Sequence, residues 1–153
     1  MSNFNYSKQR HLELLKLKYS HALTSKQKSE LNEYSSVLDG QLDWEAKEQY
    51  IALLEKLISG KINSFKFYIK FKERNELNGD IFDSLEANFL LLSPHEKSNE
   101  FSDLIIEIID FCYSYSELFE SYPTAEKFDS YDLEFRNSVE KFYLKIQKIL
   151  NEE

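Results

Sequence analysis

The chain has 153 residues, 42% of them hydrophobic and 30% charged, which suits one globular domain with its own core and excludes a wholly disordered protein. Three glycines and two prolines are too few for the frequent turns of most β-proteins, and a single cysteine excludes an intrachain disulfide and a multi-cysteine metal site. The net charge of −8 and the lack of any apolar run of about 18 residues argue against nucleic acid or a membrane as a partner. We therefore expect an all-α monomer in the cytoplasm, since the first residues also lack the apolar segment of a signal peptide.

Apolar residues recur at helical spacing along most of the chain. The predicted helices cover residues 7–23, 26–38, 44–59, 64–79, 81–92, 98–120 and 132–150. Residues 65–71 also alternate as in a strand, so both a helix and a strand fit this segment, and we expect the helix. The pattern predicts an antiparallel helical bundle of six to seven helices.

Glycine readily takes the left-handed conformation that closes a helix. The glycines that mark predicted helix ends are Gly40, Gly60 and Gly79. Asp43 suits the N-cap of the next helix, and residues 93–96, Ser-Pro-His-Glu, combine an N-cap, an N1 proline and a capping-box glutamate, so a helix should begin there or one turn later. A boundary after Gly40 divides the chain into an N-terminal helical extension, residues 1–42, and a helical bundle, residues 43–153.

The longest apolar faces predict the core. Six residues lie in the middle of such faces, namely Leu57, Ile105, Ile108, Ile109, Phe142 and Ile146. Cys112 follows on the same face, where burial keeps a thiol neutral, so we expect it to pack rather than react.

Acidic residues are concentrated in residues 80–134, which we call the acidic stretch. It holds fourteen Asp or Glu and only two basic residues, Lys97 and Lys127, a net charge of −12. Such a surface repels nucleic acid and anionic membranes and attracts a basic protein. Two interpretations stay open: a solvated surface that keeps the protein soluble, and a binding surface, for which the many tyrosines of residues 113–131 are also suited.

No local motif predicts an enzyme or a cofactor site. His11 and His21 are ten residues apart on one predicted helix, too far to share a metal ion. Asp103, Glu107 and Asp110 fall on one helix face and would suit a metal or an acid–base pair, but no Glu-x-x-His helix completes a di-metal cage. A solvated face is the better interpretation, and we expect no catalytic residue, no metal and no cofactor.

Two parts of the chain resemble a known family. Residues 51–71 combine an apolar helix, a short Gly-Lys-Ile-Asn turn and a Phe-bearing helix. Residues 106–122 and 128–142 combine an aromatic, acidic loop with a closing amphipathic helix. Over about residues 50–150 the chain therefore resembles the colicin D immunity-like family of small helical bundles.

The resemblance implies a function and a set of residues. Members of that family bind a tRNA-cleaving toxin domain and occupy its basic active-site groove with acidic side chains, without chemistry of their own. By position, the acids that would bind such a partner are Glu117, Glu120, Glu126, Asp129, Asp132 and Glu134. The predicted function is that of a non-enzymatic, immunity-like inhibitor with a basic ribonuclease toxin domain as its partner.

Two other classes of function remain open. The composition, rich in Asn, Ile, Lys, Phe and Tyr, is typical of an AT-rich bacterium or a plastid. In the chloroplast stroma the same acids would serve a structural or assembly factor that docks on a basic surface of a ribosome or another large complex. A helical enzyme that uses Asp103, Glu107 and Asp110 is the third class, and it requires a bound metal.

Overall fold

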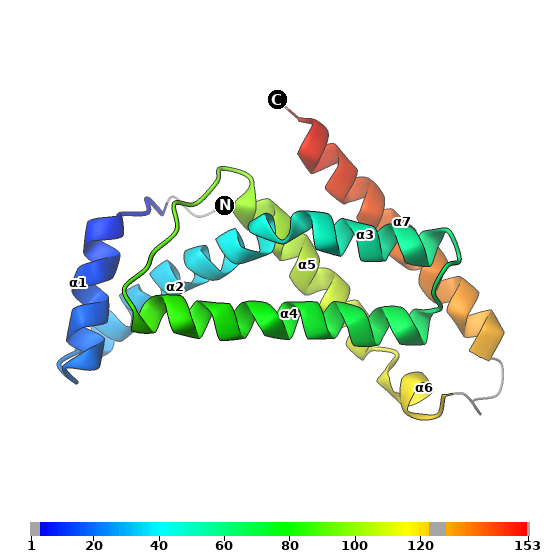
Figure 1. Ribbon diagram of the computed structural model, residues 1–153, viewed down its shortest axis with the longest axis horizontal. Coiled ribbons are helices and arrows are strands. Elements are labelled where there is room, and N and C mark those ends of the chain that lie inside the picture. Colours follow the sequence, from blue (N-terminus) through cyan, green and yellow to red (C-terminus); the bar gives the residue numbers. More distant parts are fainter. Residues whose placement is uncertain (1–3, 123–127, 153) are drawn as a thin grey trace.

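The computed structural model describes residues 4–122 and 128–152, and these residues form an all-α bundle of seven helices without a strand. The helices are α1 (Lys8–Tyr19), α2 (Ser25–Glu45), α3 (Lys47–Ile58), α4 (Ser64–Ala87), α5 (Ser98–Tyr113), α6 (Ser116–Glu120) and α7 (Phe128–Asn151). The antiparallel pair α3 and α4 lies in front of α5 and α7, while α1 stands across the far end of α2 and α4 (Figure 1). The all-α prediction is confirmed.

Two helix starts are capped by polar side chains. Thr24 and Gln27 form a complete capping box at the start of α2, and Asn63 accepts the Lys66 backbone N–H at the start of α4. The start of α5 at Ser98 is the later of the two predicted positions. The caps of α2 and α4 are polar side chains close in sequence to the helix start, whereas α5 follows Lys97 without a side-chain cap.

Two of the three glycine stops were wrong. Gly40 lies inside α2, which continues to Glu45 before α3 begins, and Gly79 lies inside α4, so the two helices predicted on either side of Gly79 are one helix. The left-handed residues that close α1 and α4 are instead His21 and Phe89, with φ of 58° and 56°. Gly60, with φ of 80°, closes α3 as predicted.

The hydrophobic residues form two clusters. The main core, among α3, α4, α5 and α7, is built on Tyr50, Leu54, Leu57, Phe67, Phe71, Phe101, Ile105, Ile108, Phe135, Val139 and Ile146. The N-terminal cluster holds Leu14, Leu15, Leu31, Tyr34, Leu38 and Leu91. Four of the six predicted core residues are fully buried, whereas Ile109 and Phe142 are partly buried at the edge of the main core.

The predicted boundary between residues 42 and 43 falls inside α2, which continues through both clusters. Asp43, expected as an N-cap, is instead a buried residue in the last turns of this helix, 3% exposed. Its carboxylate accepts hydrogen bonds from Ser102, Asn78 and Tyr50. Because these donors lie on α5, α4 and α3, Asp43 joins α2 to three other helices.

Candidate functional site: an acidic groove between α6 and α7

The candidate site depends on an interruption of the helix after α5. The sequence predicts one helix over residues 98–120, but α5 ends at Tyr113 and the short α6 begins at Ser116. Ser114, at the break, turns its hydroxyl back to the Phe111 carbonyl, at 2.5 Å. Phe119 then holds α6 on the bundle, because its ring is only 4% exposed and stacks on Tyr68, with the centroids 4.8 Å apart.

The first turns of α7 are held against the start of α4 by Asp132. Its carboxylate accepts the backbone N–H of Ser64 at 2.6 Å and an Arg136 N–H at 2.9 Å. The Ser64 N–H is one of the four that a helix leaves without a partner inside its first turn, so Asp132 caps α4 from a distant part of the sequence. Asp132 is 9% exposed, and its oxygens are therefore engaged inside the chain.

Between α6 and α7 lies a surface groove of about 500 Å³, which we call the acidic groove. It is lined by Ser114, Tyr115, Glu117, Leu118, Ser121, Tyr131 and Glu134. Glu117 comes from α6 and Glu134 from α7, and both side chains are exposed. A groove lined by two exposed carboxylates and by no basic side chain suits a cation, such as a lysine or arginine side chain of a partner.

Tyrosines supply the rest of the groove. Tyr131 is 44% exposed. Tyr115 is partly buried, and its pKa is raised by that burial and then by the charge of Glu134, with which it shares a hydrogen bond. Tyr115 therefore stays a neutral donor that orients Glu134, while Tyr131 offers an open aromatic face of the kind that is enriched at protein interfaces.

The structure brings together some of the six predicted binding residues and separates one of them. Glu117 and Glu134 line the acidic groove, and Glu120 and Asp129 are exposed at the adjoining ends of α6 and α7. Asp132 is the buried residue that caps α4, and Glu126 lies outside the described residues. Of the five predicted binding residues that the structure describes, the exposed acids are Glu117, Glu120, Asp129 and Glu134.

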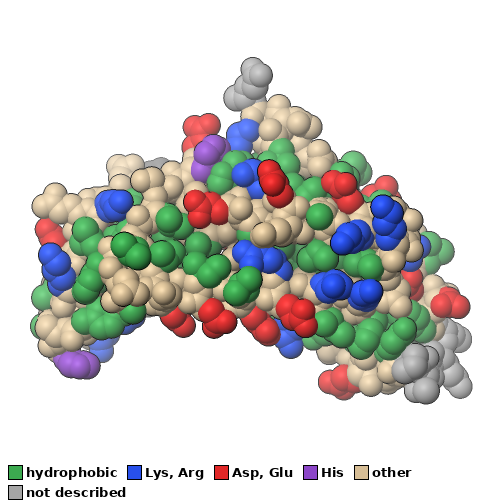
Figure 2. Space-filling view, viewed as in Figure 1, with side chains coloured by type: hydrophobic (Ala, Val, Ile, Leu, Met, Phe, Trp, Pro, Cys, Tyr) green, Lys and Arg blue, Asp and Glu red, His purple; other side chains and the backbone are tan. Residues whose placement is uncertain are grey.

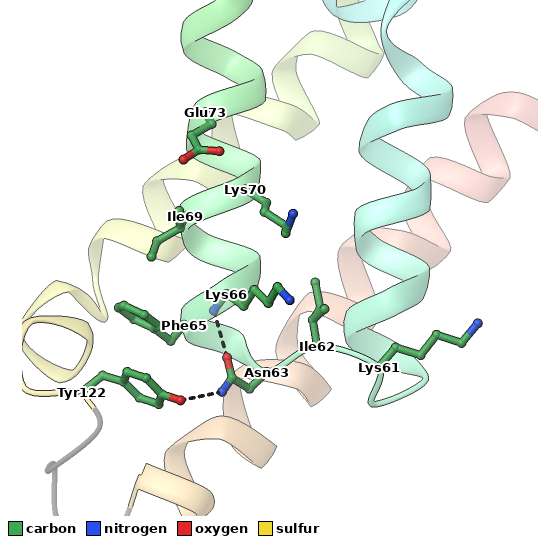
Figure 3. A pocket seen from close by; sticks show the side chains of 9 residues that line it. All are labelled: Lys61, Ile62, Asn63, Phe65, Lys66, Ile69, Lys70, Glu73 and Tyr122. Carbon is green, nitrogen blue, oxygen red and sulfur yellow. Dashed lines mark hydrogen bonds between the residues drawn. The ribbon is translucent and has the colours of Figure 1, made fainter.

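A second groove, not predicted from the sequence, lies at the start of α4 and has the opposite charge. This basic groove of about 530 Å³ is lined by Lys61, Ile62, Asn63, Phe65, Lys66, Ile69, Lys70, Glu73 and Tyr122 (Figure 3). Lysine side chains gather over the α3–α4 turn on one face of the molecule, and carboxylates line the lower edge of that face (Figure 2). The signal was present as lysines separated by aromatic residues in 61–70, but the acidic total concealed it.

The residues weighed for metal or acid–base chemistry do not converge. Asp103, Glu107 and Asp110 are exposed on the outer face of α5. Over residues 4–122 and 128–152, no group of three or more His, Cys, Asp or Glu side chains has the arrangement of a metal site. Burial raises the pKa of the Cys112 thiol to about 12, which leaves it protonated and unreactive at neutral pH.

In comparisons with protein-family models, curated proteins and solved structures, nothing matches this chain. Within the described part of the chain, none of the helices has both the length and the apolar character needed to cross a membrane.

Proposed function

We propose that this protein is a non-enzymatic binding protein, an immunity-like inhibitor that places acidic side chains in the basic active-site groove of a ribonuclease-type toxin domain. One observation carries the proposal: the acidic groove sets Glu117 and Glu134, from two helices, on either side of a surface that also exposes Tyr131. The resemblance to the colicin D immunity-like family, over about residues 50–150, names the class of partner.

The chemistry of the groove supports a protein ligand with basic side chains. An active site that cleaves RNA binds phosphates, so it presents lysine or arginine. Glu117 and Glu134 offer acceptors for these cations, and Glu120 and Asp129 extend the negative charge beside them. Acids placed in this way raise the rate of association with a basic partner, and the tyrosine supplies apolar contact area once the surfaces have met.

The test is titration with the purified nuclease domain of a colicin D-type toxin. We expect binding and loss of tRNA cleavage, with an affinity that falls steeply between about 50 mM and about 500 mM salt, because the Debye length shrinks. The double variant Glu117→Gln and Glu134→Gln should bind at least about tenfold more weakly. Circular dichroism and urea unfolding should show it as stable as the parent to within about 0.5 kcal/mol, since both side chains are exposed.

The matched control is Glu100→Gln with Glu107→Gln, two exposed acids of the same acidic stretch that lie on α5, outside the groove. It removes the same net charge. Equal losses in the two double variants would mean that only the total charge matters, and an unchanged affinity in the groove variant would remove the groove from the interface. If the toxin domain is not bound but a basic ribosomal surface is, the assembly-factor alternative replaces the inhibitor.

A further inference from the structure

The basic groove is a feature that the proposed function leaves unused. Among the described residues, the structure shows no ion pair for Lys61, Lys66 or Lys70, and all three side chains are exposed. The acidic groove and the basic groove share no lining residue. A ligand of the basic groove could therefore bind independently of the partner proposed for the acidic groove.

The two sides of the basic groove differ in chemistry. Phe65 and Ile69 point to one side of α4, where Tyr122 stacks on Phe65 with the ring centroids 4.2 Å apart (Figure 3). Lys66 and Lys70 point to the other side, toward the turn that carries Ile62 (Figure 3). A ligand lying along α4 would thus meet apolar side chains on one flank and ammonium groups on the other.

The spacing of these side chains matches an extended polypeptide. Lys66 and Lys70 are one helical turn apart, about 6 Å along the axis, as are Phe65 and Ile69. In an extended strand, side chains two residues apart lie on the same flank, about 6.7 Å apart, and the residues between them lie on the opposite flank. A strand in which acidic and apolar residues alternate therefore places its acids at the lysines and its apolar side chains at Phe65 and Ile69.

Charge further along α4 limits the ligand to a short one. Exposed carboxylates follow the lysines on the same helix, at Glu73, Glu76, Asp80 and Asp83. A polyanion such as single-stranded nucleic acid, which carries a phosphate at every nucleotide, would run from the lysines into these acids. The net charge of −8 adds a repulsion that a long polyanion feels over its whole length. A peptide segment with only two or three acids ends near Glu73, at the edge of the groove, and does not reach Glu76, Asp80 or Asp83.

From this geometry we propose that the basic groove binds an extended acidic peptide segment of a partner protein, in which aspartate or glutamate alternates with apolar residues. The groove is open along α4, so it suits a chain that lies along the helix rather than an enclosed small molecule. Lys66 and Lys70 select the acids, and Phe65 and Ile69 select the residues between them.

The experiment is a titration of the isotope-labelled protein with a capped pentapeptide of alternating aspartate and leucine, followed by amide NMR shifts. We expect saturable shifts confined to the α3–α4 turn, the first turns of α4 and Tyr122. A peptide of the same composition with three aspartates before two leucines should bind at least about fivefold more weakly, because its acids and apolar residues no longer meet opposite flanks. An oligothymidylate of similar length should not compete.

Two charge reversals and one control locate the site. Lys66→Glu and Lys70→Glu should each weaken binding about tenfold, because each replaces an attraction by a repulsion. Lys28→Glu changes the net charge equally but lies at the start of α2, at the opposite end of the molecule, and should leave the affinity unchanged (Figure 1). All three side chains are exposed, and circular dichroism checks the fold.

Each contrary result overturns the proposal. Equal affinity for the two peptides would reduce the groove to a patch of unspecific charge. Equal losses in Lys28→Glu and Lys66→Glu would place binding elsewhere. Tighter binding of the oligothymidylate would make the groove a nucleic-acid site. If the amide signals do not shift at millimolar peptide, the groove does not bind peptides of this kind.

Discussion

Asp43 and Glu86 are equally buried, each 3% exposed, yet their pKa values move in opposite directions. Burial raises the pKa of Asp43, and the opposing effects of its three neutral hydrogen-bond donors, on Ser102, Asn78 and Tyr50, and then of the Arg74 charge do not outweigh it. The main core thus shifts the balance of Asp43 toward the protonated form relative to water.

Glu86, beside the N-terminal cluster, shows the reverse. Burial again acts to raise its pKa, but hydrogen bonds from His11 and Ser35 and the charge of Lys18, 3.5 Å away, outweigh it and hold the pKa below its ordinary value. The His11 ring sits between two partners, since its Nδ1 is 2.9 Å from the Tyr6 hydroxyl and its Nε2 is 3.3 Å from Glu86. With Nε2 protonated, Glu86 accepts from the ring and Tyr6 donates to it.

The comparison shows that the direct contacts of a buried carboxylate, and not burial alone, set the direction of its pKa shift: Glu86 forms an ion pair with Lys18, whereas among the described residues Asp43 forms none and feels Arg74 only through its charge. It also separates the two regions of the molecule. The main core holds its carboxylate with neutral donors, whereas the attachment of α1 to α4 depends on an ionised one. Mutations and acid should therefore affect the two regions differently.

The largest expected effect is that of Asp43→Ala. It leaves three buried donors without their acceptor and should lower the free energy of unfolding by about 3 to 5 kcal/mol, measured by urea denaturation. Asp43→Asn keeps one acceptor oxygen and the shape, so it should cost about 1 to 2 kcal/mol. A loss below about 1 kcal/mol for Asp43→Ala would show that water or a rearranged network replaces the carboxylate.

Glu86→Ala should have a smaller and more local effect, about 2 kcal/mol, because it strips His11 and Ser35 of an acceptor at the edge of the fold. Hydrogen exchange should show faster exchange of the α1 amides, while α5 and α7 in the main core keep their protection. Glu86→Gln, which still accepts a hydrogen bond, is the milder matched variant. Uniform loss of protection along the chain would instead mean that α1 and the main core unfold as one unit.

Acid should separate the two regions without a mutation. A lowered pKa means that Glu86 contributes stability above its ordinary value of 4.5, and that this contribution is lost as the pH falls below that value through the lowered one. A raised pKa has the opposite sign, so protonation of Asp43 on the way down stabilises the main core. Between pH values of about 5 and 3, the α1 amides should lose protection first. Glu86→Gln should remove this acid step, and a step that persists in that variant has another origin.

The helices and their apolar faces could be predicted from the sequence because each depends on residues within a few turns. The mid-face residues Ile105 and Ile108 are fully buried as expected, and Thr24 and Gln27 form a local capping box at the start of α2. The interruption between α5 and α6 could not be predicted, because no proline or glycine marks it. The contact that holds α6 in place is the packing of Phe119 in the main core, which is a long-range contact without a local sequence pattern.

The candidate site shows the same division. Composition and spacing locate the exposed acids around α6, but they cannot distinguish Asp132 from Glu134, two residues away. In an α-helix this separation turns one side chain toward the α4 start and the other toward the groove. The partner of Asp132, the Ser64 N–H, is distant in sequence, and such long-range pairs leave no local pattern.

The smallest expected effect tests why two glycines did not end helices. Gly79 lies on α4 between the two carboxylate sites, next to Asn78, which binds Asp43, and seven residues before Glu86. A Cβ placed on Gly79 would meet nothing within 4 Å, and the backbone there is helical. Gly79→Ala should therefore raise the free energy of unfolding by about 0.5 to 1 kcal/mol, because alanine loses less backbone entropy in a helix. Because α4 is one continuous helix, hydrogen exchange should slow on both sides of residue 79, which couples the main core more closely to the α1 region.

Gly60→Ala is the contrasting variant. The φ of 80° at Gly60 disfavours a side chain, so this substitution should lower the free energy of unfolding by about 1 kcal/mol. A destabilised Gly79→Ala protein would mean that α4 is interrupted at this glycine in solution, and the two carboxylate sites would then respond independently to every change described above.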